Sequence, residues 1–174
     1  MAKRVIYQEP QSIFFKDVMT NTFVDKMIKT AMYYNINPSD SEVRSWGNNA
    51  PKIKDLLELS GITDSYITFE HLVPYNMKRI DCILYGRNLL GQGNVVHIEL
   101  KQWSNKGVQA AISEGNFNID EISDVTYKVQ AYTGRGNRLV AHPSQQVRGY
   151  NDYLTGFIEV LSNKELLIEG IAYC

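Results

Sequence analysis

The chain has 174 residues, of which 44% are hydrophobic and 21% are charged, and its formal net charge is -1. This length supports one hydrophobic core, and the near-neutral charge excludes a strongly basic nucleic-acid clamp. No apolar run approaches the roughly 20 residues that span a bilayer, and the N-terminus lacks the apolar core of a signal peptide. We therefore expect a single cytoplasmic domain, residues 1–174, that does not bind membranes.

Residues 1–61 are predicted to be mainly helical. Apolar side chains recur at helical spacing from Ser12 to Asn35, which indicates one or two amphipathic helices. A capped helix is expected to start after Ser39 or Ser41, to break between Gly47 and Pro51, and then to resume. These helices would form one layer of the domain.

Residues 62–174 are predicted to form a sheet with one further helix. Pro143 suits the first turn of that helix, and a last strand is expected from Leu166. The order of helices, at least three strands, a helix and a strand predicts an α/β fold with a mixed central sheet flanked by helices. The runs with strand texture are 65–73, 78–87, 94–103, 122–133 and 138–143.

Three charged residues lie inside two of these apolar runs. Glu99 and Lys101 are two positions apart and so share one face of their strand, while Asp81 lies in the preceding strand. If the two strands pair through the glycine-rich turn, Asp81 can lie beside Glu99. Two adjacent carboxylates repel unless a cation lies between them, and Mg²⁺ or Mn²⁺ suits such oxygen ligands. The pattern predicts metal-dependent cleavage of phosphodiester bonds, with Lys101 serving the attacking water and the phosphate.

This arrangement resembles the PD-(D/E)XK nuclease superfamily, with Asp81 as the first acid, Glu99 as the second and Lys101 as the lysine. The resemblance implies a restriction-endonuclease-like core of order αβββαβ, and a metal held by the two acids and the Leu100 carbonyl. Gln146 and Tyr150, four apart on the helix that follows, resemble the QxxxY motif of the RecB and Cas4-like branch. In that branch the two residues lie beside the metal and the DNA backbone.

Two further acids compete for a third acidic position in the site. Many members of the superfamily contribute an acid from the first helical layer, which favours Glu42; Glu70 in the first strand is the alternative. The segments SEVRSW, FEHLVPYNMKRID, VVHIELKQW and HPSQQVRGYNDYL resemble the N-terminal nuclease-like domain of bacterial proteins that continue into a Schlafen-type superfamily 1 DNA/RNA helicase. The resemblance implies a DNA substrate and a helicase domain as partner in a longer chain.

Less specific interpretations stay open at this stage. The charged residues could form a surface salt bridge on an edge strand, and the domain could be a nuclease-shaped module that binds DNA or a protein without cutting. The three histidines lack zinc-ligand spacing and are expected to be ordinary structural residues. Trp46 and Trp103 could stack on bases, with Trp103 favoured because it shares a strand face with Lys101, and the stretch from Gly134 to Gly136 is predicted to be a hairpin turn.

Overall fold

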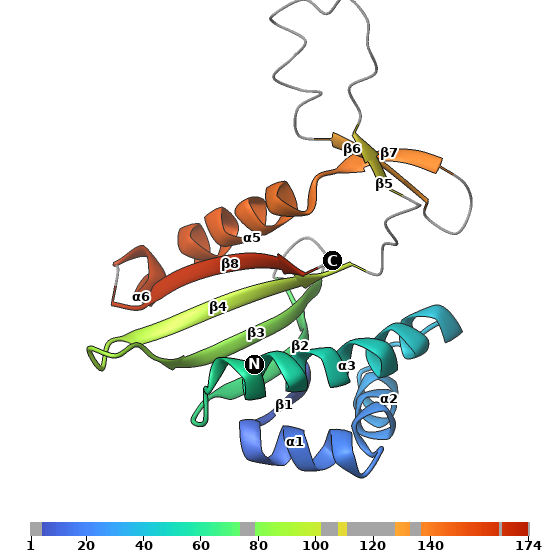
Figure 1. The fold of residues 1–174 in the computed structure, drawn as a ribbon, viewed down its shortest axis with the longest axis horizontal. Helices are drawn as coiled ribbons and strands as arrows, with labels where there is room; N and C mark the ends of the chain where they lie inside the picture. The colour runs from blue at the N-terminus through green and yellow to red at the C-terminus, as the bar shows by residue number, and fades with distance from the viewer. Residues whose placement is uncertain are drawn as a thin grey trace, which may run out of the picture.

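The protein is a mixed α/β domain built on a five-stranded sheet (Figure 1). The computed structural model describes residues 5–73, 79–101, 108–110, 128–132, 137–163 and 165–173. The expected α/β class is confirmed. In chain order the elements of this part are β1 (Val5–Pro10), α1 (Gln11–Met19), α2 (Phe23–Tyr33), α3 (Asp40–Ser60), β2 (Tyr66–Leu72), β3 (Arg79–Arg87), β4 (Gly93–Leu100), β5 (Val108–Ala110), β6 (Lys128–Tyr132), β7 (Asn137–Ala141), α5 (Pro143–Phe157), α6 (Glu159–Ser162) and β8 (Leu167–Tyr173).

The large sheet is mixed, with strand order β1-β2-β3-β4-β8. Neighbouring strands from β1 to β4 are antiparallel, and β8 is parallel to β4. A parallel pair needs a long crossover connection, and α5 lies in that connection. Strands β5, β6 and β7 form a second, antiparallel sheet of three strands.

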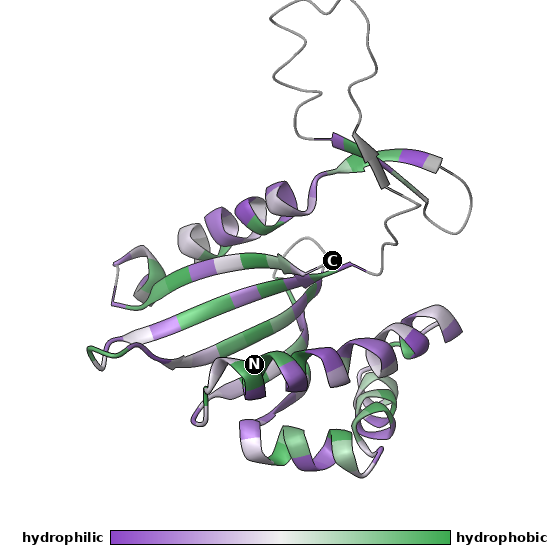
Figure 2. Cartoon of the chain, viewed as in Figure 1, coloured by the Kyte–Doolittle hydropathy of each residue, from purple (hydrophilic) through white to green (hydrophobic). Residues whose placement is uncertain are grey.

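Helices cover both faces of the large sheet (Figure 1). Helices α1, α2 and α3 bury one apolar cluster that includes Cys82, Leu84 and Ile98. Helix α5 covers the other face with a smaller cluster that includes Ile83 and Val95. Because both faces are covered, β3 and β4 bury apolar side chains on both faces, and Figure 2 shows their hydrophobic positions in green, interrupted by polar positions in purple.

Helix α3 is continuous through Gly47 and Pro51, so the predicted break there is wrong. Its start fits expectation: the Ser39 side chain accepts a hydrogen bond from the Glu42 backbone, and the Glu42 carboxylate accepts one from the Ser39 backbone. Trp46, Ala50, Ile53 and Leu57 are buried along one face, on both sides of the proline. Their packing outweighs the hydrogen bond that Pro51 cannot make.

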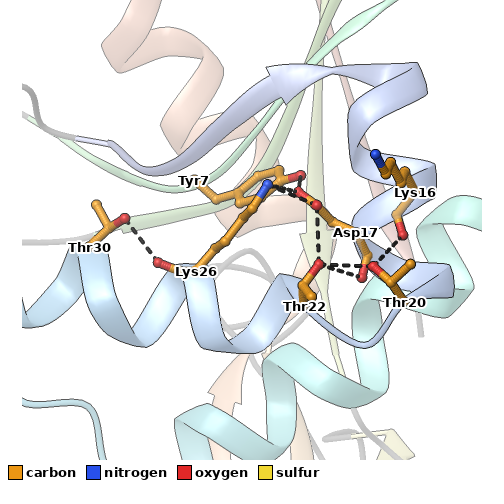
Figure 3. A network of polar contacts seen from close by, with 7 residues as sticks. All are labelled: Tyr7, Lys16, Asp17, Thr20, Thr22, Lys26 and Thr30. Atoms are coloured by element: carbon orange, nitrogen blue, oxygen red, sulfur yellow. Dashed lines mark hydrogen bonds and ion pairs between the residues drawn. The ribbon is translucent and has the colours of Figure 1, made fainter.

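Strand β1 is an element that the helical prediction for residues 1–61 omitted. A buried carboxylate fastens it to the helices that follow (Figure 3). Asp17 of α1 accepts hydrogen bonds from the Tyr7 hydroxyl at 2.8 Å, from Thr22 at 3.2 Å and from the Lys26 ammonium at 2.7 Å. Burial acts to raise the pKa of Asp17, but the hydrogen bonds from Lys26 and Tyr7 outweigh it and lower this pKa below its usual range.

Several features named from the sequence lie outside the described residues. They are Trp103, the turn at 134–136, and residues 122–127 and 133 of the fourth strand-like run. Within the described part, no helix has the length and apolar character needed to cross a bilayer.

Gly170 of β8 marks a close approach between the sheet and α5. A Cβ at this position would lie 2.2 Å from Cγ1 of Val147 and 2.7 Å from Nδ2 of Asn151. We expect Gly170→Ala to lower the free energy of unfolding by about 1–3 kcal/mol, because α5 would have to shift. As a control, Gly149→Ala on α5 meets no atom within 4 Å and should raise stability by up to about 1 kcal/mol. Urea denaturation measures the free energy of unfolding of both variants. A Gly170→Ala protein with the wild-type free energy of unfolding would contradict the close packing of α5 against β8.

Candidate active site

Asp81 and Glu99 come together where the β3–β4 ladder ends. The ladder pairs Ile83 with His97 and Cys82 with Ile98, so the next step of the same register sets Asp81 opposite Glu99. Beyond that ladder, the Asp81 carboxylate accepts a hydrogen bond from the Leu100 backbone N–H at 2.8 Å. Glu99 is only 4% exposed. Burial, and next the charge of Glu99, raise the pKa of Asp81 to about 7.

Lys101 completes the predicted trio. Its Nζ donates to Oε1 of Glu99 at 2.6 Å, and its backbone N–H bonds to Tyr173 of β8. The structure therefore brings Asp81, Glu99 and Lys101 together at one end of the sheet. In an extended strand the N–H and C=O of one residue point to the same side, so the Leu100 carbonyl lies on the side of Asp81.

A polar hollow of ≈ 520 Å³ opens beside these residues. Two helices and two strands line it, so it receives side chains from distant parts of the sequence. Gln146 and Tyr150, predicted from their spacing on α5, both reach it. Its lining residues are Glu42, Ser45, Trp46, Glu70, Arg79, Asp81, Gln146 and Tyr150.

The two candidates for a third acid are held by one arginine. Arg79 forms ion pairs with Glu42 and, at 3.0 Å, with Glu70. Glu70 also accepts a hydrogen bond from the Trp46 indole at 2.8 Å, and its φ of 53° places it in the left-handed region. The register between β2 and β3 sets Glu70 opposite Asp81, and its charge contributes to the raised pKa of Asp81. Glu70 is therefore the acid nearer to Asp81, whereas Glu42 serves the cap of α3.

Tyr150 contributes a phenol that stays protonated at neutral pH. Burial, followed by the charges of Glu99 and Asp81, raises its pKa above the usual value. Its ring meets His97 edge to face, with centroids 5.4 Å apart. The phenol can thus act as a hydrogen-bond donor to an anion in the hollow.

The sequence-based prediction did not assign Arg79 or Trp46 to the site, and it did not place His97 beside Glu99. Arg79 precedes Asp81 by two positions and so shares its strand face, which is the one signal that could have identified it. His97 is fully buried, and its Nε2 lies 3.7 Å from Oε2 of Glu99. His142, in contrast, accepts a hydrogen bond from the Ser144 backbone at the start of α5.

The donor set fits a divalent cation that keeps some of its waters. Among the described residues, no group of three or more His, Cys, Asp or Glu side chains is arranged to hold a metal ion. Two carboxylates suffice for Mg²⁺, which usually retains waters and substrate oxygens. If all are ionised, four acids (Glu42, Glu70, Asp81 and Glu99) and two cations (Arg79 and Lys101) leave two negative charges uncompensated.

Comparisons of this chain with protein-family models, with curated proteins and with solved structures find no match. Any function assigned to the chain therefore depends on the geometry of the site.

Proposed function

We propose that the protein is a metal-dependent nuclease that hydrolyses phosphodiester bonds of nucleic acid, with DNA as the expected substrate. One observation carries the proposal. Asp81 and Glu99 lie opposite each other on antiparallel strands, and Lys101 is bonded to Glu99. Adjacent buried carboxylates of this kind are costly without a cation, and a neighbouring ammonium suits a phosphate that gains charge during cleavage.

The order of elements supports a restriction-endonuclease-like core. Helix α3, strands β2, β3 and β4, helix α5 and strand β8 follow one another in the order αβββαβ, and the last strand is parallel to β4. This is the order expected for the PD-(D/E)XK superfamily. Fold order alone does not establish an activity, so the proposal depends on the site.

Asp81, Glu99 and the Leu100 carbonyl would hold the Mg²⁺ or Mn²⁺. The chemistry that such an ion supplies when bound is polarisation of a phosphoryl oxygen and a lowered pKa for water. Asp81 fits this role because burial, and next the charge of Glu99, raise its pKa, and a bound cation would offset both effects. Glu99 fits because its Oε2 is buried and has no hydrogen-bond partner among the described residues.

Lys101 and the side chains that line the hollow would orient a phosphodiester strand. Lys101, held by Glu99 at 2.6 Å, would orient the attacking water and offset phosphate charge. The protonated phenol of Tyr150 and the amide of Gln146 would donate hydrogen bonds to phosphate oxygens. A helicase domain in a longer chain would supply this site with single strands.

Glu70 is expected to matter more for cleavage than Glu42. Glu70→Gln should lower the cleavage rate by about 10-fold or more, because Glu70 acts directly on the charge of Asp81. Glu42→Gln is the matched control: it weakens the ion pair to Arg79 and the cap of α3, and should reduce stability by about 1 kcal/mol with a smaller effect on rate. Single-turnover assays measure the effect on the cleavage rate, and thermal melts measure the effect on stability. A larger rate loss in the Glu42 variant would make Glu42, and not Glu70, the third acid of the site.

The proposal is tested by incubating the purified protein with labelled linear, circular and single-stranded DNA and with RNA. Cleavage that requires Mg²⁺ or Mn²⁺ and that is lost in Asp81→Ala is the expected result. Binding without cleavage, unchanged in Asp81→Ala, would replace the nuclease by a non-cutting binding module.

A further inference from the structure

His97 is a buried polar residue whose ring lies beside Glu99, one of the proposed metal ligands. It lies two positions before Glu99 on the same face of β4, and its side chain is fully buried. Its Nδ1 lies 3.3 Å from the side-chain oxygen of Asn151 on α5, and its Nε2 lies 3.7 Å from Oε2 of Glu99. Within the described part of the chain, both Nε2 and that Oε2 lack a hydrogen-bond partner.

Of the two neutral tautomers of the His97 ring, electrostatics favour the one that carries its proton on Nε2. If Nδ1 carried the proton of a neutral ring, the lone pair of Nε2 would face the carboxylate of Glu99, which is repulsive. If Nε2 carries it, an N–H faces the carboxylate, and Nδ1 can accept from the amide of Asn151 once that amide is rotated by 180°. The oxygen and nitrogen of an asparagine amide are interchangeable assignments, so the second arrangement needs no movement of the chain.

We infer that His97 is a positioning residue for Glu99, with its Nε2–H directed at Oε2 of Glu99 and its tautomer set by Asn151. Lys101 holds the other oxygen of the same carboxylate, at 2.6 Å. A carboxylate has about four acceptor sites, so two fixed donors leave lone pairs for a cation. The Lys101 hydrogen bond and the electrostatic attraction of the His97 N–H across 3.7 Å both restrict the rotation of the carboxylate group, and a restricted ligand loses less freedom when it binds a metal.

The absence of a side chain at Gly170 leaves the space in which Asn151 contacts His97. Gly170 is the register partner of His97 on β8, and Asn151 lies against it. A side chain at position 170 would push Asn151 away from the ring. The close approach of α5 to the sheet therefore also brings Asn151 to His97.

This inference rests on the proposed metal site, so its test measures metal binding apart from cleavage. Mn²⁺ is titrated into the whole protein, and the free ion is followed by electron paramagnetic resonance. His97→Phe keeps an aromatic ring against Tyr150 but removes the donor, and we expect it to weaken Mn²⁺ binding about 10- to 100-fold. His97→Gln, which restores an N–H, should recover much of the affinity. Equal affinity of a folded His97→Phe protein would overturn the inference alone, whereas a wild-type protein that binds no Mn²⁺ would overturn the proposed metal site as well.

A second measurement does not depend on whether a variant folds. Nitrogen-15 chemical shifts of the imidazole distinguish the two neutral tautomers in the wild-type protein. The expected result is a proton on Nε2 and a bare Nδ1. A proton on Nδ1 with a bare Nε2 would overturn the inference.

Discussion

Lys101→Met should lower the rate of Mg²⁺-dependent cleavage by about 100- to 1000-fold, the usual cost of removing one group that stabilises developing charge. Methionine keeps most of the side-chain volume but carries no ammonium. The Lys101 ammonium is bonded to Oε1 of Glu99, so the variant loses a charge beside the scissile phosphate and one of the groups that hold a metal ligand. Single-turnover rates at saturating enzyme measure the effect on chemistry.

Lys29→Met on α2 is the matched control. Lys29 is exposed and belongs to a different part of the surface, so its loss should leave cleavage unchanged. Circular dichroism should show both variants folded. A folded Lys101→Met protein that cleaves at the wild-type rate would remove Lys101 from the mechanism.

Asp81→Asn should abolish cleavage and yet stabilise the metal-free protein at alkaline pH. The pKa of Asp81 is raised in the folded state to about 7, above the unfolded value of about 3.9. Between these two pKa values the folded protein therefore binds more protons than the unfolded chain does. As a result, the contribution of Asp81 to stability falls as pH rises from about 4 to 7. Asparagine removes this penalty and can still accept from the Leu100 N–H. In EDTA, we expect a gain in unfolding free energy of about 2–4 kcal/mol at pH 8 and little gain near pH 4.

Asp17→Asn provides a control of opposite sign. The pKa of Asp17 is lowered in the folded state, so its carboxylate stabilises the fold above the unfolded pKa and loses this contribution as pH falls. The substitution should destabilise the protein at pH 8, and the effect should shrink in acid. Urea denaturation at several pH values measures both variants. A gain for Asp81→Asn that did not change with pH would contradict the assigned pKa.

Secondary structure that depends on local pattern was predictable from the sequence. The apolar runs of β2, β3 and β4 and the helix after Pro143 appear where the pattern indicated. Helix α3 was predicted in two pieces because proline and glycine usually end helices, but one buried face runs past Pro51. Strand β1 was missed because its six residues pair with β2 about sixty positions later, which no local pattern records.

The residues of the candidate site likewise divide into those that local spacing could predict and those that only the packed fold brings together. Alternation along a strand and i, i+4 spacing on a helix were enough to place Glu99 with Lys101, and Gln146 with Tyr150. The contact of Arg79 with two acids joins residues from three elements, so it follows only from the packed fold. The choice between Glu42 and Glu70 likewise depended on the register of β2 against β3.

The metal site can be located directly in a crystal of the protein soaked in Mn²⁺, with anomalous scattering recorded to find the ion. We expect an anomalous peak between the carboxyl groups of Asp81 and Glu99, with the Leu100 carbonyl as a further ligand. The same crystal form of Asp81→Asn should show the peak lost or much reduced. A peak elsewhere, or none at a Mn²⁺ concentration that supports cleavage, would contradict a metal site at Asp81 and Glu99.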